Sequence, residues 1–164
     1  MDPTATPLLT TVRDEMIAYL HHLAARVERA VRAVPAEKLW VKPFPFGNSL
    51  GTLVLHLTGN LNHYVGAKIA DTGYVRDRPR EFADPGGYPA DVILHHFHAA
   101  VGMVAATIAA LDEPALCQPM TDEPPVRTTF GLLLTVIAHL NNHIGQMSYL
   151  VQALGQTTGE PPSW

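Results

Sequence analysis

Two histidines that stand four residues apart, His139 and His143, are the first candidates for chemistry in this chain. They lie in a long segment of helical apolar periodicity, where both imidazoles would project from one helix face, roughly 6 Å apart at Cβ. That spacing suits two ligands of one metal ion, because a Zn–N bond is about 2.0–2.1 Å long. Leu140 stands where the zincin motif H-E-x-x-H carries its general-base glutamate, so a zincin-type protease is not predicted.

The pair alone does not establish a metal site. The chain has nine histidines, so such a spacing also arises by chance. Two further candidates, His56 and His63, lie with Asn60 along the edge of the apolar face of another predicted helix. These two histidines are seven residues apart, so their Cα atoms are separated by about 10.5 Å and joint binding of one ion would be strained. The spacing does not decide which of them would join the pair. The remaining histidines are expected to be mainly exposed: His21, His22, His95, His96 and His98.

The elements that must position these residues are predicted from apolar residues recurring three or four positions apart. Four helices are expected. The first covers residues 8–34 and the third covers 90–111. The second begins at a cap, Asn48 or Ser49, and runs to about residue 70; the fourth begins at a cap, Thr128 or Thr129, and runs to about residue 154. Connectors rich in proline and glycine separate them. The pattern predicts an all-α four-helix bundle.

Length and composition narrow the class of protein further. At 164 residues we expect one domain over 1–164, which buries about 70% of its unfolded surface and does not need a metal to fold. The net charge of −4 gives no basic surface for nucleic acid. Cys117 is the single cysteine, and neither a signal peptide nor a membrane span is predicted, so we expect a cytoplasmic protein.

The connector over residues 71–89 is the longest segment without periodicity. Alternating charges are typical of a solvated loop, yet connections of this length are often functional. Three of its arginines fall within five residues and could bind an anionic ligand or partner: Arg76, Arg78 and Arg80.

Three motifs, in this order along the chain, resemble those of the DinB family, also called the DinB/YfiT-like metalloenzymes. The first is His56-Leu57-Thr58-Gly59-Asn60, similar to the family segment H-L-x-G-N. The second, residues 76–82, resembles the R-x-R-x-x-E-F segment of one branch. The third, His139 to Gln146, resembles H-x-x-x-H-x-G-Q. The resemblance extends over nearly the whole chain and implies a four-helix bundle with long crossover connections.

The resemblance also implies a metal held by three histidines, here His56, His139 and His143. Three neutral imidazoles would leave a coordination position open, as in catalytic sites, and nitrogen ligation favours Zn, Ni or Fe over Mg or Ca. Seven further residues are candidates to orient a ligand or to contact substrate: Asn60, His63, Tyr64, Glu81, Asn142, Gln146 and Tyr149.

Two functions remain open at this point. Known enzymes of the family resemble thiol-dependent transferases or isomerases, which implies a metal-dependent S-transferase that joins a low-molecular-weight thiol to a small electrophile. The alternative is a non-catalytic, metal-containing stress-response or interaction protein. A homodimer is expected in either case, because small residues gather on one face of the third predicted helix.

Overall fold

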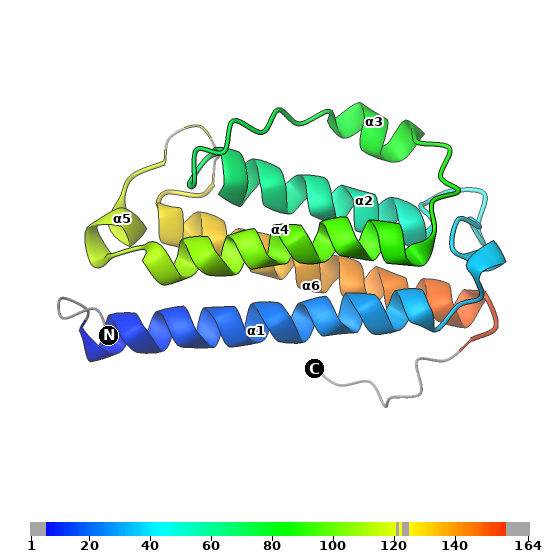
Figure 1. The fold of residues 1–164 in the computed structure, drawn as a ribbon, viewed down its shortest axis with the longest axis horizontal. Helices are drawn as coiled ribbons and strands as arrows, with labels where there is room; N and C mark the ends of the chain where they lie inside the picture. The colour runs from blue at the N-terminus through cyan, green and yellow to red at the C-terminus, as the bar shows by residue number, and fades with distance from the viewer. Residues whose placement is uncertain (1–5, 121, 123–124, 157–164) are drawn as a thin grey trace.

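Four long helical elements lie side by side in the computed structural model, which describes residues 6–120, 122 and 125–156 (Figure 1). They are α1 (Pro7–Arg32), α2 (Leu50–Leu61) with its π-helical continuation η2 (Asn62–Ala67), α4 (Ala90–Ala110) and α6 (Thr129–Ala153). Short helices stand in the connections: η1 (Ala36–Lys38), α3 (Arg78–Ala83) and α5 (Glu113–Cys117). The described residues form no strand, so the prediction of an all-α four-helix bundle is confirmed.

Helix α2 lies beside α6 in the bundle. Both α4 and α6 pack against α1 and against α2, so α1 and α2 lie diagonally across the bundle. Helices α2 and α4 run in the same direction, and the segment between them crosses back along the length of the bundle (Figure 1). This is the long crossover that the family resemblance implied, and it carries α3 over α2 (Figure 1).

Side-chain caps fix where the helices begin. The Ser49 hydroxyl accepts a hydrogen bond from the Thr52 amide at 3.1 Å, and the Thr128 hydroxyl accepts one from the Gly131 amide at 3.1 Å. Of each predicted pair of caps, the structure therefore uses Ser49 and Thr128.

The predicted apolar faces form the core. Leu20 and Leu23 of α1, Leu57 of α2 and Phe97 of α4 are at most 1% exposed. The five histidines expected at the surface are exposed. Helix α4 is the one described helix long and apolar enough to cross a membrane by length and composition alone. It packs against α1 and α2, and the core helices of soluble proteins share that composition.

Three predicted segments differ from the structure. Residues 71–89 were expected to be a loop but contain the short helix α3. Pro79 lies in the first turn of α3, and the Asp77 side chain caps it by accepting a hydrogen bond from the Arg80 amide at 3.1 Å. The connector between the third and fourth predicted helices contains a short helix, α5, capped by Asp112. The second helix does not run as regular α-helix to residue 70, because it passes into η2 at Asn62.

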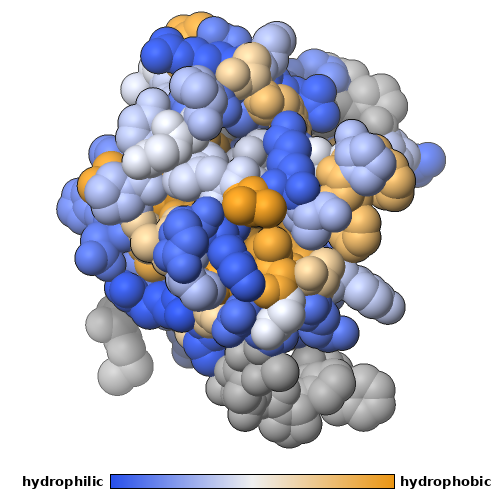
Figure 2. Space-filling view, turned by 90° about the vertical axis from the view of Figure 1, so that its right-hand side faces the viewer, coloured by the Kyte–Doolittle hydropathy of each residue, from blue (hydrophilic) through white to orange (hydrophobic). Residues whose placement is uncertain are grey.

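Trp40 fastens the far end of the crossover to the bundle. Its indole lies where a Cβ on Gly51 of α2 or on Gly86 would collide with it, and Gly86 has a φ of 75°, which favours glycine. The indole N–H donates to the Tyr88 carbonyl at 3.1 Å. Figure 2 looks onto this end of the molecule, where apolar surface lies among hydrophilic side chains; Phe44 and Phe46 of the nearby connector are exposed and stacked.

Candidate metal centre

Three imidazoles meet between α2 and α6. His56 projects from α2, and His139 and His143 project from successive turns of α6. One ring nitrogen from each lies within 4.8 Å of the others, and no fourth His, Cys, Asp or Glu of the described residues joins this group. A tetrahedral zinc site would hold nitrogens about 3.4 Å apart, so small side-chain rotations would bring all three onto one ion.

The contact between two of these rings bears directly on what they can hold. The Nε2 atoms of His56 and His139 are 3.0 Å apart. Two ring nitrogens that both offer lone pairs repel each other at this distance, so a proton or a cation must be shared between them. In the structure an Nε2–H of His139 can donate to the Nε2 lone pair of His56. A divalent ion bound by neutral imidazoles would take the place of that proton.

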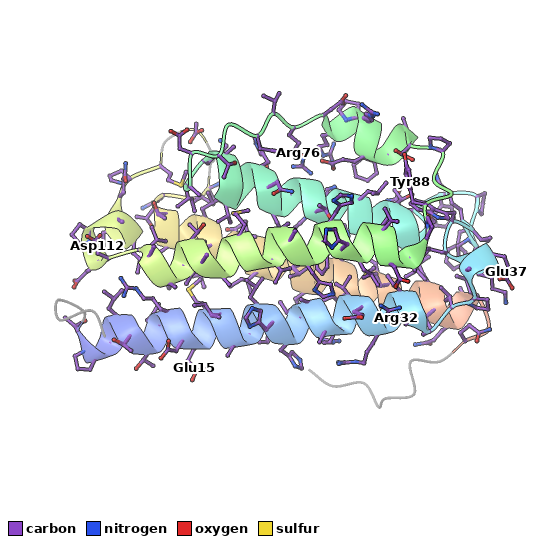
Figure 3. All side chains as sticks on the ribbon, in the orientation of Figure 1. Glu15, Arg32, Glu37, Arg76, Tyr88 and Asp112 are labelled. Atoms are coloured by element: carbon purple, nitrogen blue, oxygen red, sulfur yellow. The ribbon has the colours of Figure 1, made fainter. Side chains whose placement is uncertain are left out.

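Glu81 fixes the orientation of His56. The Nδ1–H of His56 donates to Glu81 Oε2 at 2.9 Å, which leaves Nε2 free to face the other rings. Arg76 holds the same carboxylate through two bonds, from Nε to Oε1 at 2.6 Å and from its terminal nitrogen to Oε2 at 2.9 Å. All three side chains are less than 10% exposed. Figure 3 shows Arg76 between the crossover and α2.

A glycine makes this arrangement sterically feasible. A Cβ on Gly59, one turn after His56, would collide with the Glu81 carboxylate. The fourth residue of the α2 motif is therefore glycine, which lets the Glu81 side chain lie against the helix backbone. Phe82 adds a ring contact with His56, with centroids 4.9 Å apart.

Gln146 orients His143 as Glu81 orients His56. The Nδ1–H of His143 donates to Gln146 Oε1 at 2.8 Å, across one helical turn. The Nε2 atom of His143 is thereby left as the lone-pair donor.

Burial keeps the three rings neutral, which is the form that binds metal. It lowers the pKa of His139 from 6.5 to about 4, with further lowering from the nearby His143 and His56. Burial also lowers the pKa of His56, and the hydrogen bond that His56 donates to Glu81 opposes this shift. Burial lowers the pKa of His143 as well, against the hydrogen bond to Gln146.

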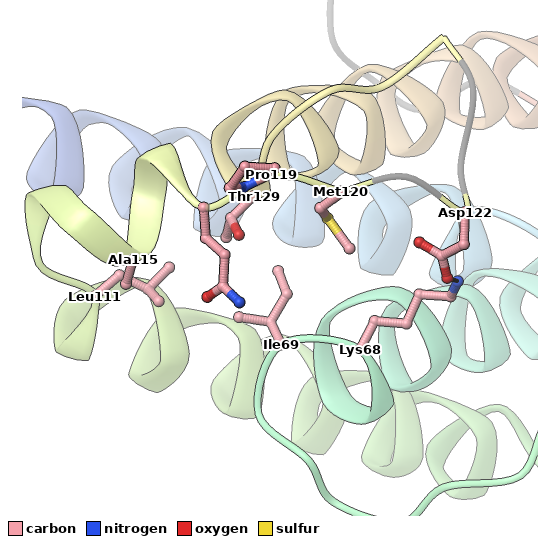
Figure 4. Close-up of a pocket in the computed structure, with 9 residues that line it drawn as sticks. Lys68, Ile69, Leu111, Ala115, Pro119, Met120, Asp122 and Thr129 are labelled. Carbon is pink, nitrogen blue, oxygen red and sulfur yellow. Dashed lines mark hydrogen bonds and ion pairs between the residues drawn. The ribbon is translucent and has the colours of Figure 1, made fainter.

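A pocket of about 190 Å³ opens beside His139, between α2 and α6. Asn60 and Tyr64 line it, so two of the predicted substrate-contacting candidates lie at its wall. Another pocket, of about 260 Å³, lies near α5 and holds the ion pair between Lys68 and Asp122, 2.6 Å apart, as Figure 4 shows. None of the three clustered histidines lines that second pocket.

The other candidates lie apart from the three rings. The ring of His63 packs against that of Tyr64, with centroids 4.8 Å apart, and is not a member of the three-histidine group. Asn142 and Tyr149 are exposed, and no described contact joins either to the three imidazoles.

Two contributors were not singled out from the sequence, Phe82 and Gly59, and the pairing of Arg76 with Glu81 was not predicted. Each stands inside a motif that the sequence displayed, but the motif alone does not reveal a contact. The sequence suggested that the three arginines could bind an anionic ligand or partner. In the structure the Arg76 guanidinium pairs with the Glu81 carboxylate of the same segment.

Comparison with known proteins places the chain in a family. The model of the DinB superfamily matches residues 19–147, and the chain belongs to this superfamily. Among solved structures it is similar to YfiT from Bacillus subtilis, described as a probable metal-dependent hydrolase with an unusual four-helix bundle topology. The TM-score is 0.71 at 18% identity, covering 94% of this chain and 93% of YfiT.

A conserved protein from Enterococcus faecalis gives a TM-score of 0.73 at 15% identity, covering 87% of this chain and 96% of that one. At these identities the likeness shows the fold. A search among curated proteins finds no match.

Proposed function

We propose that this protein is a metal-dependent enzyme in which His56, His139 and His143 hold one divalent ion. The observation that supports this most is the convergence of three ring nitrogens, without a fourth ligand candidate among the described residues, beside a pocket. Three protein ligands and an open position are typical of catalytic sites, whereas structural zinc sites use four. Zn, Ni and Fe suit this ligand set.

The ion would supply Lewis acidity and lower the pKa of a thiol or a water molecule, so that a nucleophile forms near neutral pH. The chain's own residues prepare for this. Glu81 and Gln146 hold the Nδ1–H groups of His56 and His143, which fixes both tautomers. The crossover bearing Glu81 covers one side of the group and limits access of water there.

The reaction we favour is transfer of a thiol sulfur to a small electrophile. It is supported by the resemblance of the three motifs to those of a family with thiol-dependent enzymes. Hydrolysis is the second candidate, supported by the description of YfiT as a probable metal-dependent hydrolase. The two reactions differ in the nucleophile, a thiol or a water molecule, and in the substrate that it attacks.

The experiment begins with elemental analysis of the purified protein. Bacillithiol, mycothiol, glutathione and cysteine are then tested against a panel of electrophiles by following thiol loss, and ester and amide hydrolysis is followed without thiol. We expect turnover that His143→Ala abolishes and that His96→Ala, at an exposed histidine of α4, leaves unchanged. A metal-loaded protein with no metal-dependent turnover in either assay would favour the non-catalytic interaction protein.

A further inference from the structure

The pocket beside His139 has walls that restrict what can enter it. Aliphatic side chains of Val126, Leu132 and Val136 form much of its lining. Among the described residues, none that carries a formal charge lines it. Its volume of about 190 Å³ lies below the range of roughly 300–1,000 Å³ that is usual for drug-sized ligands. The part of a ligand that enters this pocket is therefore expected to be small and mostly apolar, without a full charge.

One polar side chain at the wall of this pocket is free to contact a ligand. Asn60 is 6% exposed, and its amide makes no hydrogen bond with any residue that the structure describes. The polar atoms of this side chain are not among the buried ones that lack a partner, so they are open to the pocket. A side-chain amide that faces a pocket without a protein partner can donate to and accept from a ligand. Asn62 is different, because its amide donates to the Thr58 carbonyl at 3.1 Å.

Another polar group at the wall is less available as a donor. The Thr135 hydroxyl donates to the Gly131 carbonyl at 2.9 Å within α6. The Asn60 amide offers both a donor and an acceptor, which matches a carbonyl or carboxamide better than a lone hydroxyl.

We propose that this pocket binds a small, uncharged, largely aliphatic molecule through a carbonyl or carboxamide group, and that Asn60 positions that group beside His139. The proposal deepens the proposed function and rests on it for the chemistry, but not for the binding. It assigns the pocket to the electrophile. A thiol such as glutathione, with its two carboxylates, would approach from outside the pocket.

Butanamide serves as the probe, since it carries one carboxamide on a short aliphatic chain. Its affinity for the purified full-length protein is measured by ligand-observed NMR titration. We expect Asn60→Leu, which keeps the side-chain size and removes the hydrogen bonds, to weaken butanamide binding at least about tenfold, because an unmatched polar group is left in a buried site. The matched control is Asn62→Leu, which we expect to change the affinity less than about twofold.

A second variant tests positioning against a merely structural role. Asn60→Asp keeps the shape and adds a negative charge, so in metal-free protein, where the new carboxylate has no ion to bind, the preference should move from butanamide towards butylammonium. Butanoate is not used for this comparison because a carboxylate can bind a divalent ion directly. Equal butanamide affinities in wild type and Asn60→Leu, or equal losses in the Asn60→Leu and Asn62→Leu variants, overturn the proposal.

Metal content is measured in the same samples so that the two proposals fail separately. Asn60-dependent butanamide binding in protein that holds no metal under any loading condition supports the pocket and overturns the proposed function. Metal-loaded protein in which Asn60→Leu leaves butanamide affinity intact overturns the pocket and leaves the metal centre standing.

Discussion

Glu81 contacts His56 at Nδ1, whereas the other ring nitrogen of His56, Nε2, faces the other two imidazoles. Its carboxylate accepts the Nδ1–H of His56, and Arg76 balances its charge through two further bonds. A buried carboxylate with these partners is held in place, and the imidazole it contacts is locked in one tautomer. The sequence placed Glu81 among the candidates, but the pairing with Arg76 depends on how the crossover folds back.

At the same scale we predict that Glu81→Gln weakens metal binding by about tenfold and Glu81→Ala by up to about a hundredfold, because outer partners of ligating histidines contribute in this range. Glutamine keeps an acceptor for Nδ1–H, whereas alanine leaves His56 and Arg76 unpaired. Competition with a chromophoric chelator measures the affinity. The control is Glu37→Gln in η1, an exposed carboxylate that should have no effect. Unchanged affinity in Glu81→Ala would contradict the role given to Glu81.

The packing of α3 against α2 is the contact between elements that brings Glu81 to His56. Helix α3 has six residues, far too few to be stable alone. Its capping by Asp77, the Arg76–Glu81 pair and the contact of Phe82 with His56 stabilise it in place. Gly59 leaves the space in which its carboxylate lies.

For this reason Gly59→Ala should displace Glu81 and weaken metal binding by about tenfold, as loss of a partner of the ligating imidazole does. The helix itself should not suffer, because alanine is favoured over glycine in helices by roughly 0.5–1 kcal/mol. Gly145→Ala on α6 is the matched control, since a Cβ there meets nothing within 4 Å. We expect that control to keep full affinity and to gain a little stability in urea unfolding. Equal affinities in the two variants would show that the Gly59 contact is unimportant.

Elements of different length were predictable to different degrees. The long helices carry apolar stripes over many turns, and residues such as Leu57 and Phe97 are buried as those stripes required. Helix α3 was not predicted because its stability comes from contacts distant in sequence. Periodicity also left His56 and His63 equivalent; the packing of α2 against α6 brings His56 to the other two rings, and only the motif resemblance had indicated this residue.

For the whole molecule, the core is large enough that we expect the fold to survive without metal. Chelation should leave the helical circular dichroism unchanged while lowering the melting temperature, because a ligand of the native state stabilises it by about 4 kcal/mol at a thousand times its Kd. His143→Ala should be folded and should show no such shift when metal is added. Loss of the helical signal on chelation would mean that the ion is structural.

A homodimer remains our prediction for the assembly. On α4, Gly102, Ala106 and Ala109 are exposed on one face, which would let a second copy approach closely. Ala106→Glu should produce a monomer in light scattering, whereas Ala18→Glu, at an exposed position of α1, should leave the dimer intact. A monomeric wild type at high micromolar concentration would remove this prediction.

The packing of Trp40 against the crossover and α2 also makes its fluorescence a probe of the crossover. The protein has two tryptophans, and replacing Trp164 by phenylalanine leaves Trp40 as the sole indole fluorophore. Trp40 touches the chain at Gly86 and Tyr88, a few residues beyond Glu81, and the start of α2 at Gly51. Its emission wavelength therefore reports whether the crossover is packed against the bundle, and a shift on adding metal or ligand would show that these contacts change.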